Sequence, residues 1–251
     1  MENKKIFHYE EIDSTNTQAS RLAHEGAEHG TVILAESQTA GKGRRGRSWE
    51  SPKGENIYMS VLLRPTFQAE KAPMLTLIMA YGVTKTLQKY GFSDVCIKWP
   101  NDVVLSEKKV CGILTEMSMK DNQIDYVVIG VGVNVNNHSF PIELCGKATS
   151  LRLEGGKVID KEMLCVDILN YFKNLYERFE TTQDLSFIRE EYNQLLVNCQ
   201  KEVLVLEPGN EYVAYAHGIN DKGELLVRTE AGEEKTVFAG EVSVRGIYGY
   251  V

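Results

Sequence analysis

The sequence predicts an α+β fold: a mixed, largely antiparallel sheet with helices on one side, followed by a small β-barrel. Three observations lead to this prediction. Strand-like and helical runs intermingle over the first 197 residues, and strand-like runs between residues 94 and 135 are joined by turns too short for parallel pairing. From Cys199 onward, only short strands with turn signals occur. We therefore expect a large domain over residues 1–197 and a small β domain over residues 198–251.

The elements of the large domain follow from apolar spacing and from local start and stop signals. A short first strand precedes "DSTNTQASRLAHEG", which has polar capping residues, a helical stretch and a closing Gly26. Pro65 stops one strand, and Gly91 ends a largely buried helix. The remaining runs predict strands at 31–37 and 56–65, helices at 73–91, 160–180 and 185–197, and a strand meander with turns at "SEKK" and "KDNQ".

Composition limits the classes of function. Apolar and charged residues make up 43% and 25% of the chain, as in ordinary globular proteins, and the formal net charge of −7 argues against a general nucleic-acid binder. The five cysteines lie far apart with no CxxC pair, and the histidines are too scattered for a zinc site. There is no signal-peptide core and no apolar run as long as a membrane span, so we expect a cytoplasmic protein that binds neither nucleic acid nor membrane.

One stretch runs against the acidic balance. "TAGKGRRGRSW", residues 39–49, places four cations among three glycines and ends in Trp49. Glycines let backbone N–H groups converge on an anion, and arginine forks add bidentate contacts to carboxylate or phosphate. A flexible, solvated loop is the alternative, but the position between two strands and the costly tryptophan favour an anion site. The spacing is not that of a P-loop.

Three further motifs carry weaker signals on their own. In "KWPND" (98–102), Pro100 restricts the backbone at the end of a strand and so fixes the directions of the polar side chains, although an ordinary turn explains the motif equally well. "EKKVCGIL" (107–114) has a glycine inside a strand, which often marks close approach by a ligand, whereas Lys108 reads as a solvated turn residue. "VIGVGVNVNN" (128–137) is a glycine-punctuated strand without the GxGxxG of a dinucleotide site.

Taken together and in order, the motifs DSTN, AESQTAGKGRRGRSW, NIYMS, KWPND, KVCGILTE and VIGVGVNVN resemble those of the biotin–protein ligases. The resemblance covers essentially the whole chain, and it implies a catalytic domain related in fold to class II aminoacyl-tRNA synthetases plus an SH3-like C-terminal barrel. The implied activity joins biotin and ATP, with Mg²⁺, into biotinyl-5′-AMP and passes biotin to a lysine of a biotin carboxyl carrier protein or domain of a carboxylase. Because the catalytic pattern begins within the first dozen residues, we expect no operator-binding domain, while a monomer and a homodimer both remain open.

The resemblance also implies roles for residues of the biotin site. Ser14, Thr15 and Asn16 with Gln38 are expected around the ureido ring. Lys42, Gly43 and Arg44 are expected along the biotin tail and the adenylate, with Gly41 shaping the segment. Lys42 stands where many members carry Arg, which keeps the charge and loses the fork geometry. Lys109 is expected at the biotin carboxylate and α-phosphate, and Gly112 is expected to let the ring lie against the backbone.

The nucleotide site is implied in the same way. Arg47, Lys98, Asn101 and Asp102 are expected to face the triphosphate and metal, with Asp102 as the Mg²⁺ ligand. Trp49 is expected on the adenine side, and Asn134, beyond Gly130 and Gly132, at the adenine edge. The implied catalytic residues are Lys109, Arg44, Lys98 and Asp102.

Two other functions compete with this interpretation. A lipoate- or octanoate-handling ligase or transferase of the same fold should have an apolar ring pocket that lacks the donors of Gln38 and residues 14–16. A non-catalytic anion- or nucleic-acid-binding module explains neither KWPND nor the second glycine-punctuated strand.

Overall fold

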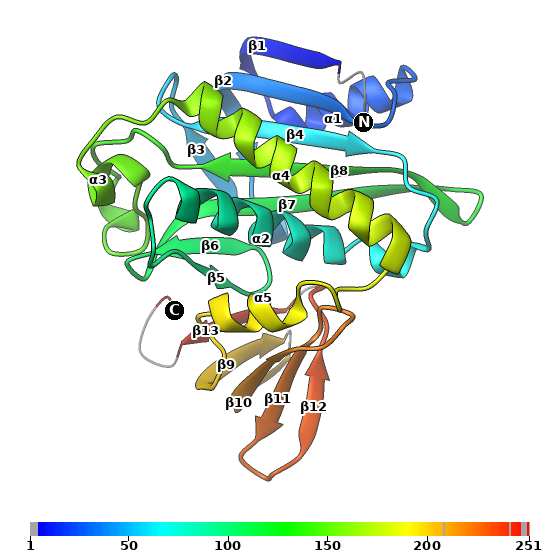
Figure 1. Cartoon of the computed structure of the whole chain (residues 1–251), viewed down its shortest axis with the longest axis vertical. Helices are drawn as coiled ribbons and strands as arrows, with labels where there is room; N and C mark the ends of the chain where they lie inside the picture. Colours follow the sequence, from blue (N-terminus) through cyan, green and yellow to red (C-terminus); the bar gives the residue numbers. More distant parts are fainter. Residues whose placement is uncertain (1–4, 208, 241, 247–249, 251) are drawn as a thin grey trace.

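Two sheets make up the framework of the molecule (Figure 1). The structure is a computed structural model and describes residues 5–207, 209–240, 242–246 and 250. In the larger sheet the strands run in the order β1-β2-β4-β8-β7-β6-β5, and β3 pairs with β2 beside this path. Their bounds are β1 Ile6–Ile12, β2 Thr31–Lys42, β3 Ser48–Ser51, β4 Ile57–Leu63, β5 Cys96–Lys98, β6 Asp102–Leu105, β7 Lys108–Lys120 and β8 Gln123–Val133.

The pairing within this sheet is mixed and largely antiparallel, as predicted. Only β1 and β2 pair in parallel, and β5 to β8 form the expected meander. Strand β2 runs past the predicted end at residue 37 to Lys42, so the first part of the basic stretch is strand rather than loop. A short 3-10 turn at Arg44–Gly46 and strand β3 complete that stretch.

Two long helices cover one face of the sheet (Figure 1). They are α2 (Met74–Lys89), which is buried over most of its length, and α4 (Lys161–Thr182), which begins where the Asp160 carboxylate accepts hydrogen bonds from the amides of Glu162 and Met163. Both match the predicted helices closely. The main core lies between these helices and alternate residues of the sheet, such as Val61 of β4.

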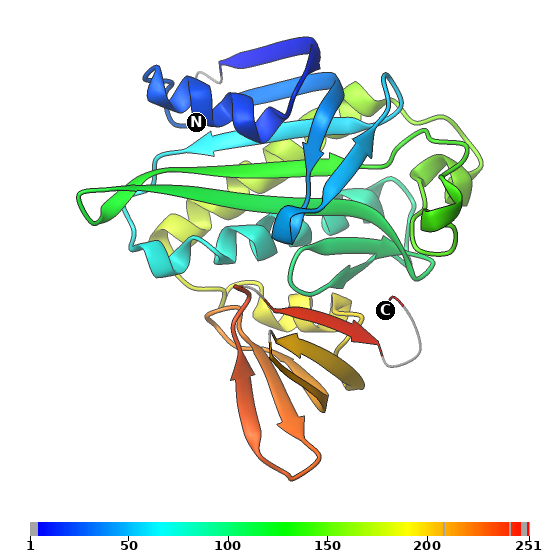
Figure 2. The ribbon, with the colours of Figure 1, turned by 180° about the vertical axis from the view of Figure 1, so that it is seen from behind.

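The first helix, α1 (Thr15–His24), lies on the opposite face (Figure 2). Its Ala19 and Leu22 pack against Leu62 and Val128, whose neighbours along each strand belong to the main core. Because successive strand residues point to opposite faces, this alternation places α1 across the sheet from α2 and α4. The expectation of helices on one side therefore holds for the two long helices, while α1 leaves room on its own face for a site.

Two short helices complete the large domain. Helix α3 (Leu151–Gly155) was not expected from the sequence; the Ser150 hydroxyl caps it by accepting from the Leu153 amide. Helix α5 (Arg189–Leu195) is shorter than the predicted 185–197. The Asp184 carboxylate accepts from both the amide and the hydroxyl of Ser186, and this local turn competes with helix formation.

The C-terminal sheet is antiparallel, with strand order β12-β11-β10-β9-β13, and it contains no helix in its described part. Its strands are β9 Lys201–Glu207, β10 Asn210–Ile219, β11 Leu225–Thr229, β12 Glu234–Val237 and β13 Ser243–Gly246. The expected boundary between residues 197 and 198 lies between α5 and β9. Trp99, almost fully buried in the large domain, donates its indole N–H to the carbonyl of Gly223 at 3.0 Å and so ties the two sheets together.

Trp99→Phe should lower the free energy of unfolding by about 1–3 kcal/mol, because it removes the indole donor to the carbonyl of Gly223 while keeping most of the apolar ring. Urea denaturation followed by circular dichroism measures the change. Trp49→Phe serves as the control, since Trp49 is only partly buried. Equal effects of the two substitutions would contradict a bridging role for Trp99.

Candidate functional site

A narrow cavity of about 80 Å³ opens on the face of the sheet that carries α1. Strands β2, β7 and β8, the start of α1 and the basic stretch form its walls. This volume is below the 300–1,000 Å³ typical of sites for drug-sized ligands. The lining residues are Ser14, Thr15, Asn16, Gln38, Lys42, Gly43, Arg44, Trp49, Tyr58, Asn101, Lys109, Gly112, Ile113, Leu114, Gly130, Val131 and Gly132.

One end of the cavity is built around Asn16. Its side-chain carbonyl accepts from the Ser60 hydroxyl at 2.7 Å, and its amide nitrogen donates to a Glu116 carboxylate oxygen at 2.6 Å. The structure gives a reason for Gly130, because a Cβ at that position would overlap the Asn16 side chain. The glycine in β8 is therefore needed for the close approach of a polar side chain from α1.

Gln38 joins the start of α1 to strands β2 and β3. Its side-chain carbonyl accepts from the Thr15 amide at 2.8 Å and the Thr15 hydroxyl at 3.2 Å, while its Nε2 donates to Ser51 Oγ at 3.0 Å. A Cβ at Gly41 would collide with the carbonyl oxygen of Trp49, so this glycine allows β2 and β3 to lie close together. This end of the cavity is polar and mostly neutral.

The basic stretch supplies cations along the cavity. Lys42 Nζ lies 3.6 Å from a Glu116 oxygen. Arg44 reaches in two directions: Nη1 donates to Asn101 Oδ1 at 3.1 Å, and Nη2 donates to three backbone carbonyls of the C-terminal domain. These carbonyls belong to Ala239, Gly240 and Val242, at 3.0, 2.6 and 3.0 Å. Burial lowers the pKa of Arg44 below its ordinary value.

At the other end of the cavity, Asp102 pairs with Lys109. Lys109 Nζ lies 2.7 Å from Asp102 Oδ1, and these side chains are only 19% and 13% exposed. Burial opposes ionisation of Asp102, but the ammonium of Lys109, together with Tyr250 and Lys98, outweighs burial and holds the pKa of that carboxyl below its usual range. The same ammonium lies 4.9 Å from the centroid of the Trp49 ring, and the Lys109 side chain fills the space that a Cβ at Gly112 would take.

Lys98 and Tyr250 lie beside this ion pair. Lys98 is 6% exposed, and burial lowers its pKa to about 8. The ring of Tyr250 stands 3.5 Å from Lys98 Nζ, measured to the ring centroid, and its hydroxyl donates to Asp102 Oδ2 at 2.5 Å. The pKa of Tyr250 is raised by burial and by the neighbouring carboxylate.

Most of the residues predicted for the site come together at this cavity. Five do not line it. Lys98 and Asp102 lie behind Lys109, Gly41 supports β2 and β3, and Arg47 is exposed. Asn134 is the fifth: its amide nitrogen donates to the carbonyls of Thr149 at 3.0 Å and Lys109 at 3.5 Å and so fastens the end of β8, while its role at the adenine edge stays a prediction.

Sequence reasoning missed four side chains at the site: Tyr58, Ser60, Glu116 and Tyr250. Tyr58 and Ser60 belong to NIYMS, a motif that was noted without a role for either residue. The alternation of side-chain direction along β4 could have indicated both residues, since Tyr58, Ser60 and Leu62 share the face that packs against α1. Nothing in the sequence indicated that Tyr250, far along the chain, returns to Asp102.

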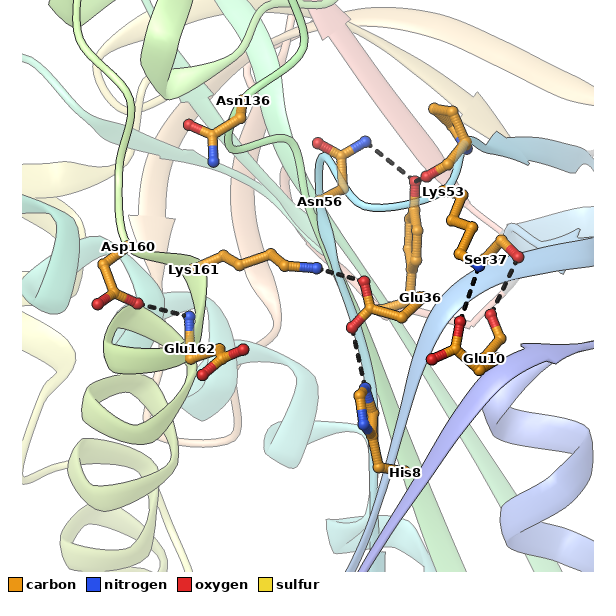
Figure 3. Close-up of polar contacts among 12 residues, drawn as sticks. His8, Glu10, Glu36, Ser37, Lys53, Asn56, Asn136, Asp160, Lys161 and Glu162 are labelled. Carbon is orange, nitrogen blue, oxygen red and sulfur yellow. Dashed lines mark hydrogen bonds and ion pairs between the residues drawn. The ribbon is translucent and has the colours of Figure 1, made fainter.

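A second polar cluster lies on the opposite face, between β1, β2 and α4 (Figure 3). Glu36 accepts from Lys161 Nζ at 2.6 Å and lies 2.9 Å from His8 Nε2, and these contacts lower the pKa of Glu36. Asn56 Nδ2 donates to the hydroxyl of Tyr58, and Tyr58 lines both this region and the first cavity. The contact of Lys161 with Glu36 fastens the start of α4 to strand β2.

Two absences hold for the described part of the chain. No group of three or more His, Cys, Asp or Glu side chains is arranged to hold a metal ion there. No helix among those residues is long and apolar enough to span a membrane.

Comparison with known proteins identifies the class. The model of the biotin/lipoate A/B protein ligase family matches residues 9–134, and that of the biotin protein ligase C-terminal domain matches residues 199–245. The chain therefore belongs to the biotin/lipoate A/B protein ligase family. Since the C-terminal domain is that of the biotin protein ligases, and curated relatives at 30% identity or more are of that kind, the chain belongs to their branch.

Two curated relatives and one solved structure illustrate the likeness. The bifunctional ligase/repressor BirA of Bacillus spizizenii is 34% identical over 95% of this chain and 74% of its own length. The biotin–[acetyl-CoA-carboxylase] ligase of Paracoccus denitrificans is 32% identical over 93% of this chain and 98% of its own. The biotin protein ligase of Aquifex aeolicus, solved in complex with biotin and ATP, has a TM-score of 0.85 and 30% identity, covering 97% of this chain and all of that one.

Gly130→Ala should lower the free energy of unfolding by about 1–3 kcal/mol, because the added methyl group displaces Asn16 from its hydrogen bonds to Ser60 and Glu116. Gly132→Ala is the matched control in the same strand, since a Cβ there meets nothing within 4 Å. Urea denaturation of both variants gives the comparison. The cost of Gly130→Ala should shrink in an Asn16→Ala background, and an unchanged cost would count against this steric argument.

Proposed function

We propose that the protein is a biotin–protein ligase that activates biotin with ATP to biotinyl-5′-AMP and pyrophosphate, then transfers biotin to a lysine of a biotin carboxyl carrier protein or domain. The observation that carries this proposal is the division of the cavity into a neutral polar end and a cationic end. Family membership and the likeness to biotin protein ligases support it over the whole chain.

The neutral end suits the ureido ring of biotin. A cyclic urea offers two N–H donors and one carbonyl acceptor, and it carries no charge. Thr15, Asn16 and Gln38 provide amide and hydroxyl groups held by neighbouring strands, so they are oriented before a ligand arrives. We assign the biotin ring to this end, with Ser14 beside these residues and the valeryl tail running past Lys42 and Gly43.

The cationic end suits the reaction. Attack of the biotin carboxylate on the α-phosphate brings two anions together while pyrophosphate leaves. Cations fixed in place lower this barrier by positioning and electrostatic stabilisation rather than by covalent help. We assign Lys109 to the carboxylate and α-phosphate, Arg44 to the adenylate, Lys98 and Arg47 to the leaving phosphates, and Trp49 to the adenine. Asn101 orients Arg44, since it accepts from that guanidinium.

Mg²⁺ is proposed as the metal that accompanies ATP. Magnesium in nucleotide sites is commonly held by one or two carboxylates together with the substrate phosphates. Asp102 is a single carboxylate of this kind at the cationic end, and its lowered pKa keeps it ionised and able to bind a cation. When bound, the ion would neutralise charge on the phosphates.

The basic stretch is the wall that we expect to move. Acyl-adenylates hydrolyse readily, so a segment that opens for the substrates and closes over the intermediate protects it from water. The second step then needs only the acceptor lysine, held against the mixed anhydride. All five cysteines are free thiols, in line with the cytoplasmic location we propose.

The purified protein should exchange labelled pyrophosphate into ATP when biotin is added, and not with lipoate or octanoate. The polar groups at the neutral end disfavour these acids, because their apolar chains would leave donors and acceptors unpaired. Exchange with lipoate or octanoate in place of biotin would assign the protein to the rival function within the same fold.

Lys109→Ala should reduce the exchange rate by about 10²–10³-fold, because it removes a cation from the reacting carboxylate and phosphate. Lys108→Ala is the matched control: its side chain pairs with Glu154 at 3.3 Å, outside the cavity, and the rate should hardly change. Similar small losses in the two variants would remove Lys109 from the catalytic residues.

A further inference from the structure

Tyr250 lies at the cationic end of the site, where the proposed function has no use for it. Its hydroxyl donates to Asp102 Oδ2 at 2.5 Å, and Lys98 Nζ lies 3.5 Å from the centroid of its ring. Both are favourable contacts of a kind that a phenol can make, namely a hydrogen bond to a carboxylate and a cation–π contact. The side chain is partly buried by them.

The surroundings of this ring are unusually positive. Lys98 and Lys109 both act on the Asp102 carboxylate, so two ammonium groups share one negative charge. Arg47 and Arg245 add positive potential at Lys98 and at Tyr250. A neutral ring does not cancel that charge, whereas a polyphosphate chain does.

The two groups that Tyr250 contacts are the same two that the proposed function assigns to the nucleotide. Lys98 is assigned to the leaving phosphates and Asp102 to the metal that accompanies them. Lys109 and Asn101 contact Asp102 Oδ1, and Tyr250 donates to Oδ2, so a metal held by Asp102 would have to replace one of these contacts. The phenol would therefore compete with the metal and the phosphates for the Asp102 carboxylate and the Lys98 ammonium.

We propose that Tyr250 docks in the phosphate subsite of the nucleotide-free protein and is displaced when ATP binds. The inference rests on the proposed function for the identity of the ligand. The contacts that Tyr250 makes are lost when the nucleotide enters, so they lower the apparent affinity for the nucleotide, as any competing conformation does. The contacts of Tyr250 are with Asp102 and Lys98 and not with the residues assigned to the biotin ring, so we expect them to affect biotin binding less than nucleotide binding.

Isothermal titration with the non-hydrolysable analogue α,β-methylene-ATP and Mg²⁺, in the absence of biotin, tests the proposal. Tyr250→Ala should bind the analogue roughly ten-fold more tightly than the wild type, because the competing contacts are gone. Tyr250→Phe keeps the ring over Lys98 and loses the hydrogen bond to Asp102, so its affinity should lie between the two. Equal or weaker binding by Tyr250→Ala would overturn displacement and make Tyr250 a residue that positions Asp102.

Tyr215→Ala is the matched control, since this tyrosine of the C-terminal sheet donates to Gln200 and lies outside the cavity. Its affinity for the analogue should equal that of the wild type. Thermal unfolding of each variant establishes that a change in affinity does not reflect a change in folding. Tighter binding in Tyr215→Ala as well would mean that the effect is not specific to Tyr250, and would overturn the proposal.

A second measurement follows the ring itself. Protein labelled with 3-fluorotyrosine gives a ¹⁹F resonance for Tyr250, assigned by its loss in Tyr250→Phe. Saturating α,β-methylene-ATP with Mg²⁺ should move this resonance to the position of an exposed tyrosine, whereas biotin alone should leave it in place. A resonance that does not respond to the nucleotide would overturn displacement.

The two proposals fail separately in these experiments. If biotin-dependent pyrophosphate exchange is absent while Tyr250→Ala still tightens binding of the analogue, the proposed function falls and the competition stands. If exchange is present and Tyr250→Ala binds no more tightly, the competition falls and the ligase function stands.

Discussion

The buried ion pair between Asp102 and Lys109 is the interaction on which the rest of the site depends. Removing Asp102 would leave the ammonium groups of Lys109 and Lys98 without a carboxylate in a poorly hydrated place, which is far more costly than losing an exposed pair. The pair also sets the direction of the Lys109 side chain, which fills the space left by Gly112 and reaches the cavity. Asn101, Trp49 and Tyr250 are arranged around these two charges, so the cationic end is organised from its centre outward.

One face of the large sheet forms the hydrophobic core, and the other face carries the candidate site. Alternate residues of β4 and β8 fill the core beneath α2 and α4, and the residues between them face α1 and the cavity. Small residues on the cavity face, such as Gly130, leave space where polar side chains from α1 can approach the strands. The packing of the main core is not weakened by these glycines, because their positions face the cavity and not the core.

Much of the fold and of the site could be predicted from the sequence, and there are physical reasons why the rest could not. The strands, the two long helices and the meander follow from apolar periodicity and short turns, and the basic stretch was recognisable from its charge and glycine content. The face of the sheet on which α1 lies depends on which alternate strand residues it covers, and the sequence of the helix does not indicate that choice. The direction of a side chain is likewise not readable from its position in the sequence, as the contacts of Asn134 with Thr149 and Lys109 illustrate. The contacts of Tyr250 join positions 148 residues apart, a separation at which local patterns carry no information.

The contact between Arg44 and the C-terminal domain uses main-chain carbonyl oxygens only. Every amino acid carries the same carbonyl, so substitutions at positions 239, 240 and 242 that preserve the backbone path keep all three acceptors. The C-terminal side of this contact therefore tolerates changes of side chain. The other side requires an arginine, because lysine lacks the planar guanidinium that reaches Asn101 and the carbonyls at the same time. Related chains can therefore differ in sequence at these positions of the C-terminal domain and still keep the hydrogen bonds to this arginine.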